Sequence, residues 1–338
     1  MRYIESINKS LHHLMEINEK VIVIGEDILD PYGGAFKVTQ GLSSKYNDRV
    51  ITTPISEASI FGFSTGLAMS GYLPILEIMF GDFITLCTDQ IINGASKFKW
   101  MYGNNIDVPL VVRTPMGGRR GYGPTHSQTL ETIYLSVPGI KIIAPSNLHN
   151  PGEILISAVL HENDPTLFIE NKTLYASDVF DFVNGKTNFD DFYIEEVTPE
   201  KQYATLNIRV DKNYESDTIL ISYGGMTPII LESMKTLFIE DEIAIEALIP
   251  SLIKPIPIDD ILKRINGKKN IIICEESIKT SGWGSEVSCQ IRESKYVCNN
   301  VNILRIGSLP YPIPASKKLE SMVLPQVNDI IKVVKNNT

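Results

Sequence analysis

The chain has 338 residues, of which 43% are hydrophobic and 21% are charged. This composition is typical of a soluble globular protein, and the length is sufficient for two domains with separate cores. The formal net charge of −9 argues against a nucleic-acid partner. No segment reaches the roughly 18 uninterrupted apolar residues that a membrane span requires, so we expect a cytoplasmic protein that makes no membrane contact.

Short apolar runs alternate with helical patterns over the first half of the chain. The expected strands are Val21–Ile24, Val50–Thr52, Pro74–Ile78, Pro109–Arg113, Ile140–Ala144 and Thr166–Glu170. The expected helices lie near residues 4–18, 57–71, 82–98 and 149–162. Such alternation predicts βαβ units and a largely parallel sheet, whose ligands bind beyond the carboxyl ends of the strands. Glu26, Glu57, Phe83 and the loop 115–127 follow expected strands closely, so this fold would gather them at one edge.

The stretch 172–216 is rich in Asp, Glu and Asn and has few regular apolar repeats. We interpret it as a connector with some irregular structure. The alternation then resumes, with expected strands at Thr218–Ser222, Ile243–Leu248, Asn270–Cys274 and Val301–Arg305, and expected helices near 226–238, 258–265 and 284–294. The predicted fold class is therefore α/β with two domains, 1–171 and 217–338, each a mostly parallel sheet flanked by helices.

Neither the cysteines nor the histidines form a metal-binding pattern. Cys87, Cys274, Cys289 and Cys298 have no CxxC or zinc-ligand spacing, and no set of His, Cys and acidic residues is spaced to hold a metal. We expect reduced thiols in a cytosol-like compartment. The Gly-Trp-Gly sequence at 282–284 lacks the third glycine of a dinucleotide loop, so we interpret it as a tight strand-to-helix turn.

The sequence TPISE at residues 53–57 places a carboxylate between a short apolar strand and an apolar helix that is rich in small residues. No residue near Glu57 in the sequence could neutralise its charge. A carboxylate in this position is either a helix-start residue that faces water or a buried acid with a raised pKa. The local sequence leaves both alternatives open.

His126 follows a loop of glycine and proline residues at 117–125. The glycines oppose regular structure and let the backbone approach a ligand closely. An imidazole titrates near neutrality, so His126 could donate to a developing oxyanion or exchange a proton with an intermediate. The alternative is a solvent-facing loop histidine. Arg119 and Arg120 in the same loop would either attract a carboxylate substrate or be solvated.

A series of stretches in chain order extends this pattern over nearly the whole chain. They are GED at 25–27, GGAFKVT at 33–39, TPISE at 53–57, PILEIMFGDF at 74–83, DQIIN at 89–93, VRTP at 112–115, THSQ at 125–128, VPGIK at 137–141, SYG at 222–224, EE at 275–276 and PQV at 325–327. Together they resemble the β subunit of the first component of the 2-oxo acid dehydrogenase complexes, a family of thiamine-diphosphate enzymes. The resemblance implies a pyrimidine-binding domain followed by a transketolase C-terminal-like domain.

The resemblance also implies roles for individual residues. It assigns to Glu57 the carboxylic acid that hydrogen-bonds to the far pyrimidine nitrogen of thiamine diphosphate and holds the ring in its imino form. It assigns to Phe83 the aromatic ring that stacks on the pyrimidine, with Met79 and Ile55 as weaker candidates for the same wall. Phe83 would equally fit a core aromatic at a helix start. In the family, the histidine equivalent to His126 meets the 2-oxo acid and the acyl acceptor.

Two further acids, Glu26 and Asp89, match family residues thought to relay protons between paired active sites. Helix caps or salt-bridge partners are the alternative interpretation of these acids. The family's metal motif, Gly-Asp-Gly with a later Asn, is absent, since the Gly-Asp-Phe at 81–83 belongs to the pyrimidine side. The resemblance therefore implies that a partner α subunit holds Mg²⁺ and the diphosphate half of the cofactor, in an α2β2 heterotetramer.

The resemblance suggests additional partners and leaves the substrate open. A K⁺ ion would brace the loops near residues 110 and 160, and an acyltransferase component with a lipoyl domain would be a further partner. The loop YGNN at 102–105 departs from the family's Ser-Gly-Gly, and GPTH at 123–126 is also similar to transketolases. Both loops lie where substrate or acceptor would enter.

The predicted function is decarboxylation of a 2-oxo acid, pyruvate or a branched-chain acid, with transfer of the acyl group to an acceptor. One rival is a split transketolase-like ketol transferase or another biosynthetic thiamine-diphosphate enzyme. A rival of a different class is a non-catalytic scaffold paralogue.

Overall fold

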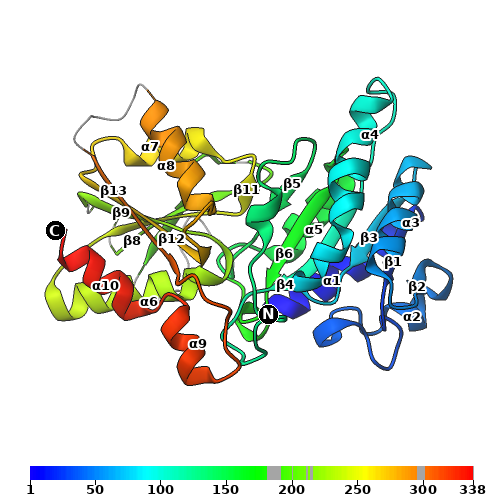
Figure 1. The fold of residues 1–338 in the computed structure, drawn as a ribbon, viewed down its shortest axis with the longest axis horizontal. Helices are drawn as coiled ribbons and strands as arrows, with labels where there is room; N and C mark the ends of the chain where they lie inside the picture. The colour runs from blue at the N-terminus through cyan, green and yellow to red at the C-terminus, as the bar shows by residue number, and fades with distance from the viewer. Residues whose placement is uncertain (181–191, 200, 211, 214–215, 295–300, 338) are drawn as a thin grey trace. The chain divides into compact units, whose positions relative to one another are not determined.

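The computed structural model describes residues 1–180, 192–199, 201–210, 212–213, 216–294 and 301–337. The chain divides into two compact units (Figure 1). The first comprises Met1–Gly117, Gln128–Ile143 and Asn150–Val179, and the second comprises Gly118–Ser127, Ala144–His149 and Phe180–Thr338. Among the described residues, no helix is both long and apolar enough to cross a membrane.

The first unit contains a parallel sheet with strand order β5-β6-β4-β3-β1-β2. Its strands are β1 (Val21–Gly25), β2 (Val50–Thr52), β3 (Leu73–Glu77), β4 (Val111–Met116), β5 (Lys141–Ile143) and β6 (Thr166–Asn171). Its helices are α1 (Tyr3–Ile17), α2 (Leu42–Lys45), α3 (Glu57–Met69), α4 (Ser96–Met101) and α5 (Pro151–His161). Every residue of β1, β4 and β6 is buried, as expected for a parallel sheet covered on both faces.

The helix expected at 82–98 is not continuous. A 3₁₀ segment, η3 (Gly81–Cys87), is followed by a π-helical segment, η4 (Gln90–Ala95), and only then by α4. The hydroxyl of Thr85 donates to the carbonyl of Asp82, and that of Thr88 donates to the carbonyl of Thr85, both at 2.8 Å. These side-chain bonds reinforce the tight three-residue turns, which apolar spacing alone does not reveal.

The second unit contains a six-stranded sheet with order β13-β12-β9-β10-β8-β7. Its strands are β7 (Tyr193–Glu196), β8 (Thr205–Arg209), β9 (Thr218–Ile221), β10 (Glu246–Pro250), β12 (Asn270–Ile278) and β13 (Asn302–Ser308), and β11 (Leu252–Lys254) follows β10 along the chain. Its helices are α6 (Thr227–Asp241), α7 (Ile258–Ile265), α8 (Trp283–Glu293), α9 (Lys317–Val323) and α10 (Val327–Lys335). The β13-β12-β9-β10 pairs are parallel, whereas β8 runs antiparallel to β10 and β7.

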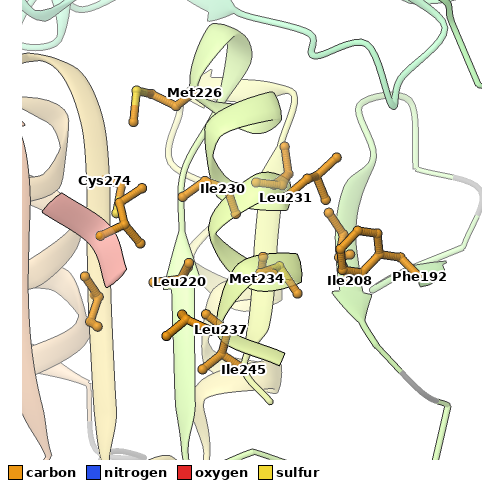
Figure 2. Packing of buried hydrophobic residues seen from close by; sticks show 14 of the residues in the cluster. Phe192, Ile208, Leu220, Met226, Ile230, Leu231, Met234, Leu237, Ile245 and Cys274 are labelled. Atoms are coloured by element: carbon orange, nitrogen blue, oxygen red, sulfur yellow. The ribbon is translucent and has the colours of Figure 1, made fainter. Parts of the chain in front are cut away.

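The core of the second unit lies around α6. Figure 2 shows Ile230, Met234 and Leu237 of this helix beside Leu220 of β9, and all four are fully buried. Helix α10 packs against α6 (Figure 1). Apolar side chains at intervals of three and four residues thus bind the helix to the sheet.

The predicted α/β class with two mostly parallel sheets is confirmed. The stretch 172–216, predicted to be a connector, contributes β7 and β8 to the second sheet. Residues 181–191, 200, 211 and 214–215 of that stretch lie outside the described residues, so the predicted domain boundaries remain a prediction. Three described cysteines, Cys87, Cys274 and Cys289, are free thiols, and Cys298 lies outside the described residues.

Candidate active site

Glu57 is the first residue of α3, and it is buried with 7% of its surface exposed. The helix begins after Ser56 and is apolar over most of its length. The structure therefore shows a buried carboxyl group at this position and not one that faces water. Burying a carboxylate is unfavourable unless an ion or hydrogen bonds compensate it, so its surroundings decide what it can do.

Glu26 follows β1 and lies beside the start of α3. Burial raises the pKa of Glu26, the negative charges of Glu57 and Asp27 raise it further, and the backbone N–H of Ser56 opposes the rise by donating to the carboxylate. The Oε1 atom of Glu26 has no hydrogen-bond partner within the described part of the chain. Two carboxyl groups therefore meet at the carboxyl end of β1, and no positive charge among the described residues is a cause of the Glu26 pKa shift.

The segment η3 packs against α3 and adds an aromatic ring and a thiol to this place. Phe83 is half-buried, and its ring lies edge-on to Phe80 with centroids 5.8 Å apart. Cys87 is buried, and burial together with the charges of Glu57 and Glu26 raises the pKa of its thiol to about 12. The thiol is therefore neutral beside the two carboxylates.

Close packing sets the start of η3. A Cβ atom added at Gly81 would lie 2.2 Å from Cγ of Met116 at the end of β4, so only glycine fits there. The next residue, Asp82, is buried and its Oδ1 accepts from Nε2 of Gln128 at 2.8 Å. Gln128, the last residue of the THSQ stretch, thus holds the start of η3 in place.

The remaining predicted residues of the first unit occupy different environments. Met79 is half-buried between β3 and η3, whereas Ile55 is 79% exposed just before α3. Asp89 is exposed, and its Oδ1 accepts from Nδ2 of Asn93 at 2.8 Å. The structure therefore brings Glu57, Glu26 and Cys87 together, while Asp89 makes a local helix-surface contact.

A buried ion-pair network, which the sequence did not reveal, lies in the same sheet. Arg113 Nη1 donates to Glu77 Oε2 at 2.9 Å, Arg113 Nη2 donates to Glu170 Oε2 at 2.9 Å, and Arg113 Nε lies 2.7 Å from Glu170 Oε1. Glu77 Oε1 also accepts from the backbone N–H of Ala35, and Glu170 Oε2 accepts from the hydroxyl of Tyr175. The only sequence signal was a charged residue within each of three buried strands.

A chain of aromatic rings connects this network to Phe83. The ring of Phe36 lies 5.2 Å from that of Tyr175 and 6.1 Å from that of Phe80, and Phe80 contacts Phe83. The ammonium of Lys172 lies 5.4 Å from the Phe80 centroid, a cation–π distance. Phe36 has a φ of 57°, which is rare for a bulky residue. These ring contacts thus support the side of Phe83 that faces Phe80.

His126 lies in the loop 118–127, which belongs to the second unit. It is half-buried, and its Nδ1 lies 3.0 Å from the hydroxyl oxygen of Thr125. Arg119 donates from Nη2 to the Pro325 carbonyl at 2.7 Å, and its Nε lies 3.8 Å from Glu276 Oε2. The guanidinium of Arg120 lies 5.7 Å from the ring centroid of Tyr122.

The first unit presents chemistry suited to the pyrimidine end of thiamine diphosphate. Glu57 offers a buried carboxyl group, Glu26 has an unpaired Oε1, and Phe83 offers a half-buried ring. Across the described ranges, no group of three or more His, Cys, Asp or Glu residues could hold a metal ion. The buried carboxyl groups and the half-buried ring are side chains of the kinds that can hydrogen-bond to and stack on an aminopyrimidine ring.

The ammonium group of Lys99 lies between the segments near residues 110 and 160. Nζ of Lys99 lies 3.0 Å from Asp107 Oδ1 and 3.1 Å from Asp164 Oδ1. This ammonium bridges the two loops that K⁺ was expected to brace.

Family models and full-length relatives agree with this arrangement. The model "Transketolase, pyrimidine binding domain" matches residues 1–177, and "Transketolase, C-terminal domain" matches residues 207–330. The pyruvate dehydrogenase E1 component subunit beta of Porphyra purpurea is 35% identical over 327 residues, covering 95% of this chain and 92% of that protein. The acetoin:2,6-dichlorophenolindophenol oxidoreductase subunit beta of Cupriavidus necator is 31% identical over 340 residues, covering 96% and 94%.

Solved structures support the fold. A split-gene transketolase, described as an inactive beta4 tetramer, has a TM-score of 0.73 at 16% identity and covers 100% of this chain and 98% of its own. Transketolase from Campylobacter jejuni has a TM-score of 0.69 at 14% identity, with coverage of 99% and 46%. The chain belongs to the thiamine-diphosphate-dependent, transketolase-like family of β subunits that includes those of the pyruvate dehydrogenase E1 component and of acetoin oxidoreductase.

Proposed function

We propose that the chain is the β subunit of a heteromeric thiamine-diphosphate enzyme that decarboxylates a 2-oxo acid and passes the acyl group to an acceptor. The observation that carries this proposal is the pair of buried carboxylates, Glu57 and Glu26, which face each other without a counter-charge. Such a pair opposes folding stability. A buried acid with a raised pKa at the carboxyl edge of a parallel sheet, as Glu26 is here, is typical of functional sites.

The residues of the first unit would hold the pyrimidine end of the cofactor. When bound, thiamine diphosphate supplies a carbon nucleophile for the substrate carbonyl and an electron sink for the resulting negative charge. Glu57 would hydrogen-bond through its carboxyl group to the pyrimidine nitrogen, with the carboxyl group of Glu26 beside it. Phe83, Met79 and Ile55 would form the apolar wall of the site.

Proton exchange with the substrate is the role that we propose for His126. Its Nδ1 contacts the hydroxyl of Thr125, which orients the imidazole ring. An imidazole held in this way can donate and accept a proton near neutral pH. Glu26 and Asp89 remain the proposed relay acids between paired sites.

Exposed apolar side chains on the first unit favour the binding of a partner chain. Large apolar side chains on α3, η3 and α4 are exposed, namely Phe63, Leu86, Trp100 and Met101. A Cβ atom added at Gly62 or Gly66 of α3 would meet no other atom, so this helix face is open to close packing. Exposed apolar groups of this kind mark permanent interfaces.

We propose that an α-type subunit covers this surface in an α2β2 heterotetramer. It would supply Mg²⁺ and the diphosphate half of the site. The relatives named above are themselves called beta subunits. An acyltransferase component with a lipoyl domain is the proposed acyl acceptor.

Oxidation of acetoin is a second candidate function. It is supported by the acetoin oxidoreductase beta subunits of Cupriavidus necator and Bacillus subtilis, both 31% identical to this chain over nearly its whole length. The same carboxylate pair and aromatic wall would serve either substrate, because both reactions use the same cofactor chemistry. The substrate that the complex turns over therefore decides between the two candidate functions.

The test uses the chain purified together with its α-type partner, with thiamine diphosphate and Mg²⁺ added. Carbon dioxide release is measured on pyruvate and branched-chain 2-oxo acids, dye reduction is measured with acetoin, and ketol transfer is measured between sugar phosphates. We expect carbon dioxide release on at least one 2-oxo acid. Dye reduction with acetoin alone would establish the second candidate, and ketol transfer alone would establish the transketolase-like rival. Inactivity in all three assays, with cofactor bound, would contradict an enzymatic role.

A further inference from the structure

Two buried carboxylates bind the backbone of the loop 118–127. The N–H of Gly118 donates to Glu276 Oε1 at 2.7 Å, the N–H of Arg119 donates to Glu320 Oε1 at 2.7 Å, and the N–H of Gly121 donates to Glu320 Oε2 at 3.1 Å. Glu276 is 6% exposed and Glu320 is 2% exposed. Three donors within four consecutive residues therefore bind to acids that lie about 160 and 200 positions further along the chain.

The loop needs such support because its backbone is strained. Arg119 has a φ of 69°, a left-handed conformation that a long side chain rarely adopts. A Cβ atom added at Gly118 would lie 2.7 Å from Cδ1 of Leu324, so the backbone packs closely against the residue that follows α9. The guanidinium of Arg119 also donates to the carbonyl of Pro325 and lies 3.8 Å, measured from Nε, from Glu276 Oε2. These contacts hold the loop in a conformation that includes one left-handed residue other than glycine.

The two acids come from different elements of the second unit. Glu276 lies in β12, where the pairing with β13 changes register between Cys274 and Ile278. Its neighbour Glu275 accepts instead from the N–H of Gly284 in the first turn of α8, at 3.2 Å. Glu320 lies on α9. Adjacent residues of a strand point to opposite faces, so these two neighbouring carboxylates bind different targets, one of which is the loop.

We propose that Glu276 and Glu320 are positioning residues that fix the loop 118–127 and so orient His126 for its reaction. They act through the backbone of residues 118–121, and His126 follows five residues later. This inference rests on the proposed role of His126. Neutralising either acid should let the loop relax towards other backbone conformations and misplace the imidazole, because a charge-assisted hydrogen bond is lost.

The experiment compares Glu320→Gln and Glu276→Gln with the matched control Glu275→Gln, all in the complex with the α-type partner. Hydrogen exchange of peptides covering 117–127 reports on the loop without any need for activity. We expect faster exchange in this segment for both loop variants and unchanged exchange for the control. If one loop variant does not fold, the other decides, because each acid binds a different donor.

Kinetics of a double-mutant cycle then connect the loop to His126. We expect Glu320→Gln to lower kcat roughly 10- to 100-fold with cofactor affinity unchanged, and to have less than about a twofold effect in a His126→Ala background. Equal losses in both backgrounds, or unchanged exchange in the loop, would overturn the inference. If His126→Ala alone leaves kcat unchanged, the proposed role of His126 fails, and the exchange data still decide whether the acids fix the loop.

Discussion

The first unit buries two sets of carboxylates in very different ways. Glu77 and Glu170 lie in the centre of the sheet and share the guanidinium of Arg113. Glu26 and Glu57 lie at the edge where β1 ends and α3 begins, and they face each other's negative charge. Both sets expose little surface, although Glu77 and Glu170 are the more deeply buried. The clearer difference is the positive charge of Arg113 beside Glu77 and Glu170.

The pKa shifts express this difference. Burial raises the pKa of Glu77, and the charge of Arg113 opposes that rise. Burial also disfavours the charged guanidinium, but Glu170 and Glu77 outweigh it and raise the pKa of Arg113. Around Glu26, by contrast, both burial and the neighbouring carboxylates raise the pKa. The carboxylates paired with Arg113, which we call the compensated set, belong to the structure of the sheet. Glu26 and Glu57, the uncompensated set, remain available for a ligand.

The largest expected effect comes from removing the proposed catalytic acid. Glu57→Gln in the complex should lower turnover about 10²- to 10⁴-fold, since the carboxyl proton is lost while the shape of the side chain is kept. The free energy of unfolding should not fall, because the change removes a like charge beside Glu26. Steady-state kinetics and urea unfolding check both statements, with the exposed Glu19→Gln as control. Turnover within twofold of wild type would contradict the assignment.

Breaking the compensated set should act on stability. Arg113→Met should lower the free energy of unfolding by about 3–5 kcal/mol, because it leaves two buried carboxylates unpaired. Urea unfolding of the chain measures this loss. Adding Glu77→Gln and Glu170→Gln to Arg113→Met should recover part of the stability, since no unpaired charge then remains. A loss below about 1 kcal/mol for Arg113→Met would remove the contrast between the two sets.

The aromatic wall should affect cofactor affinity more moderately. Phe83→Ala should weaken binding of thiamine diphosphate by the complex about tenfold, the usual loss when an aromatic ring no longer stacks on a base-like ring. Phe83→Leu should lose less, because an apolar side chain remains. Calorimetric titration compares the three proteins. Equal affinities would mean that Phe83 is only a core residue, as its contact with Phe80 also permits.

The smallest expected effect comes from Glu26. Its pKa in the folded chain is raised above the ordinary value of 4.5, so its contribution to stability is greatest below about pH 4.5 and is lost as the pH rises through the raised value. Glu26→Gln resembles the protonated acid at every pH. It should therefore be more stable than wild type at neutral pH, by less than about 1 kcal/mol, and equally stable in acid. A variant less stable than wild type at pH 7 would show a hidden counter-charge.

Much of the fold followed from apolar patterning, and the reasons for the failures are physical. The run VIVIG at 21–25 is buried throughout, and the sequence predicted β1 to within one residue. The helix at 82–98 was mispredicted because hydroxyl-to-carbonyl bonds of Thr85 and Thr88 support tight turns that hydrophobic spacing does not encode. The tail contains α9 and α10, which are short and were not predicted.

The candidate site was predictable in part. Glu57 stood out because its helix supplies no compensating charge, and the structure shows it buried. The partners of Arg113 could not be predicted, since Glu77 and Glu170 lie 36 and 57 positions away and meet it only through strand register. Glu320 was missed for the same reason, because its contacts with the loop span about 200 positions.

The central claim is that this chain carries half of a cofactor site, built on an uncompensated carboxylate pair. The most direct measurement is calorimetric titration of thiamine diphosphate with Mg²⁺ into the chain alone, into its α-type partner alone, and into the complex with wild-type chain or Glu57→Ala. The account predicts tight binding only by the wild-type complex, with weakened binding when Glu57 is replaced. Equally tight binding by this chain alone, or by the complex regardless of Glu57, would contradict it.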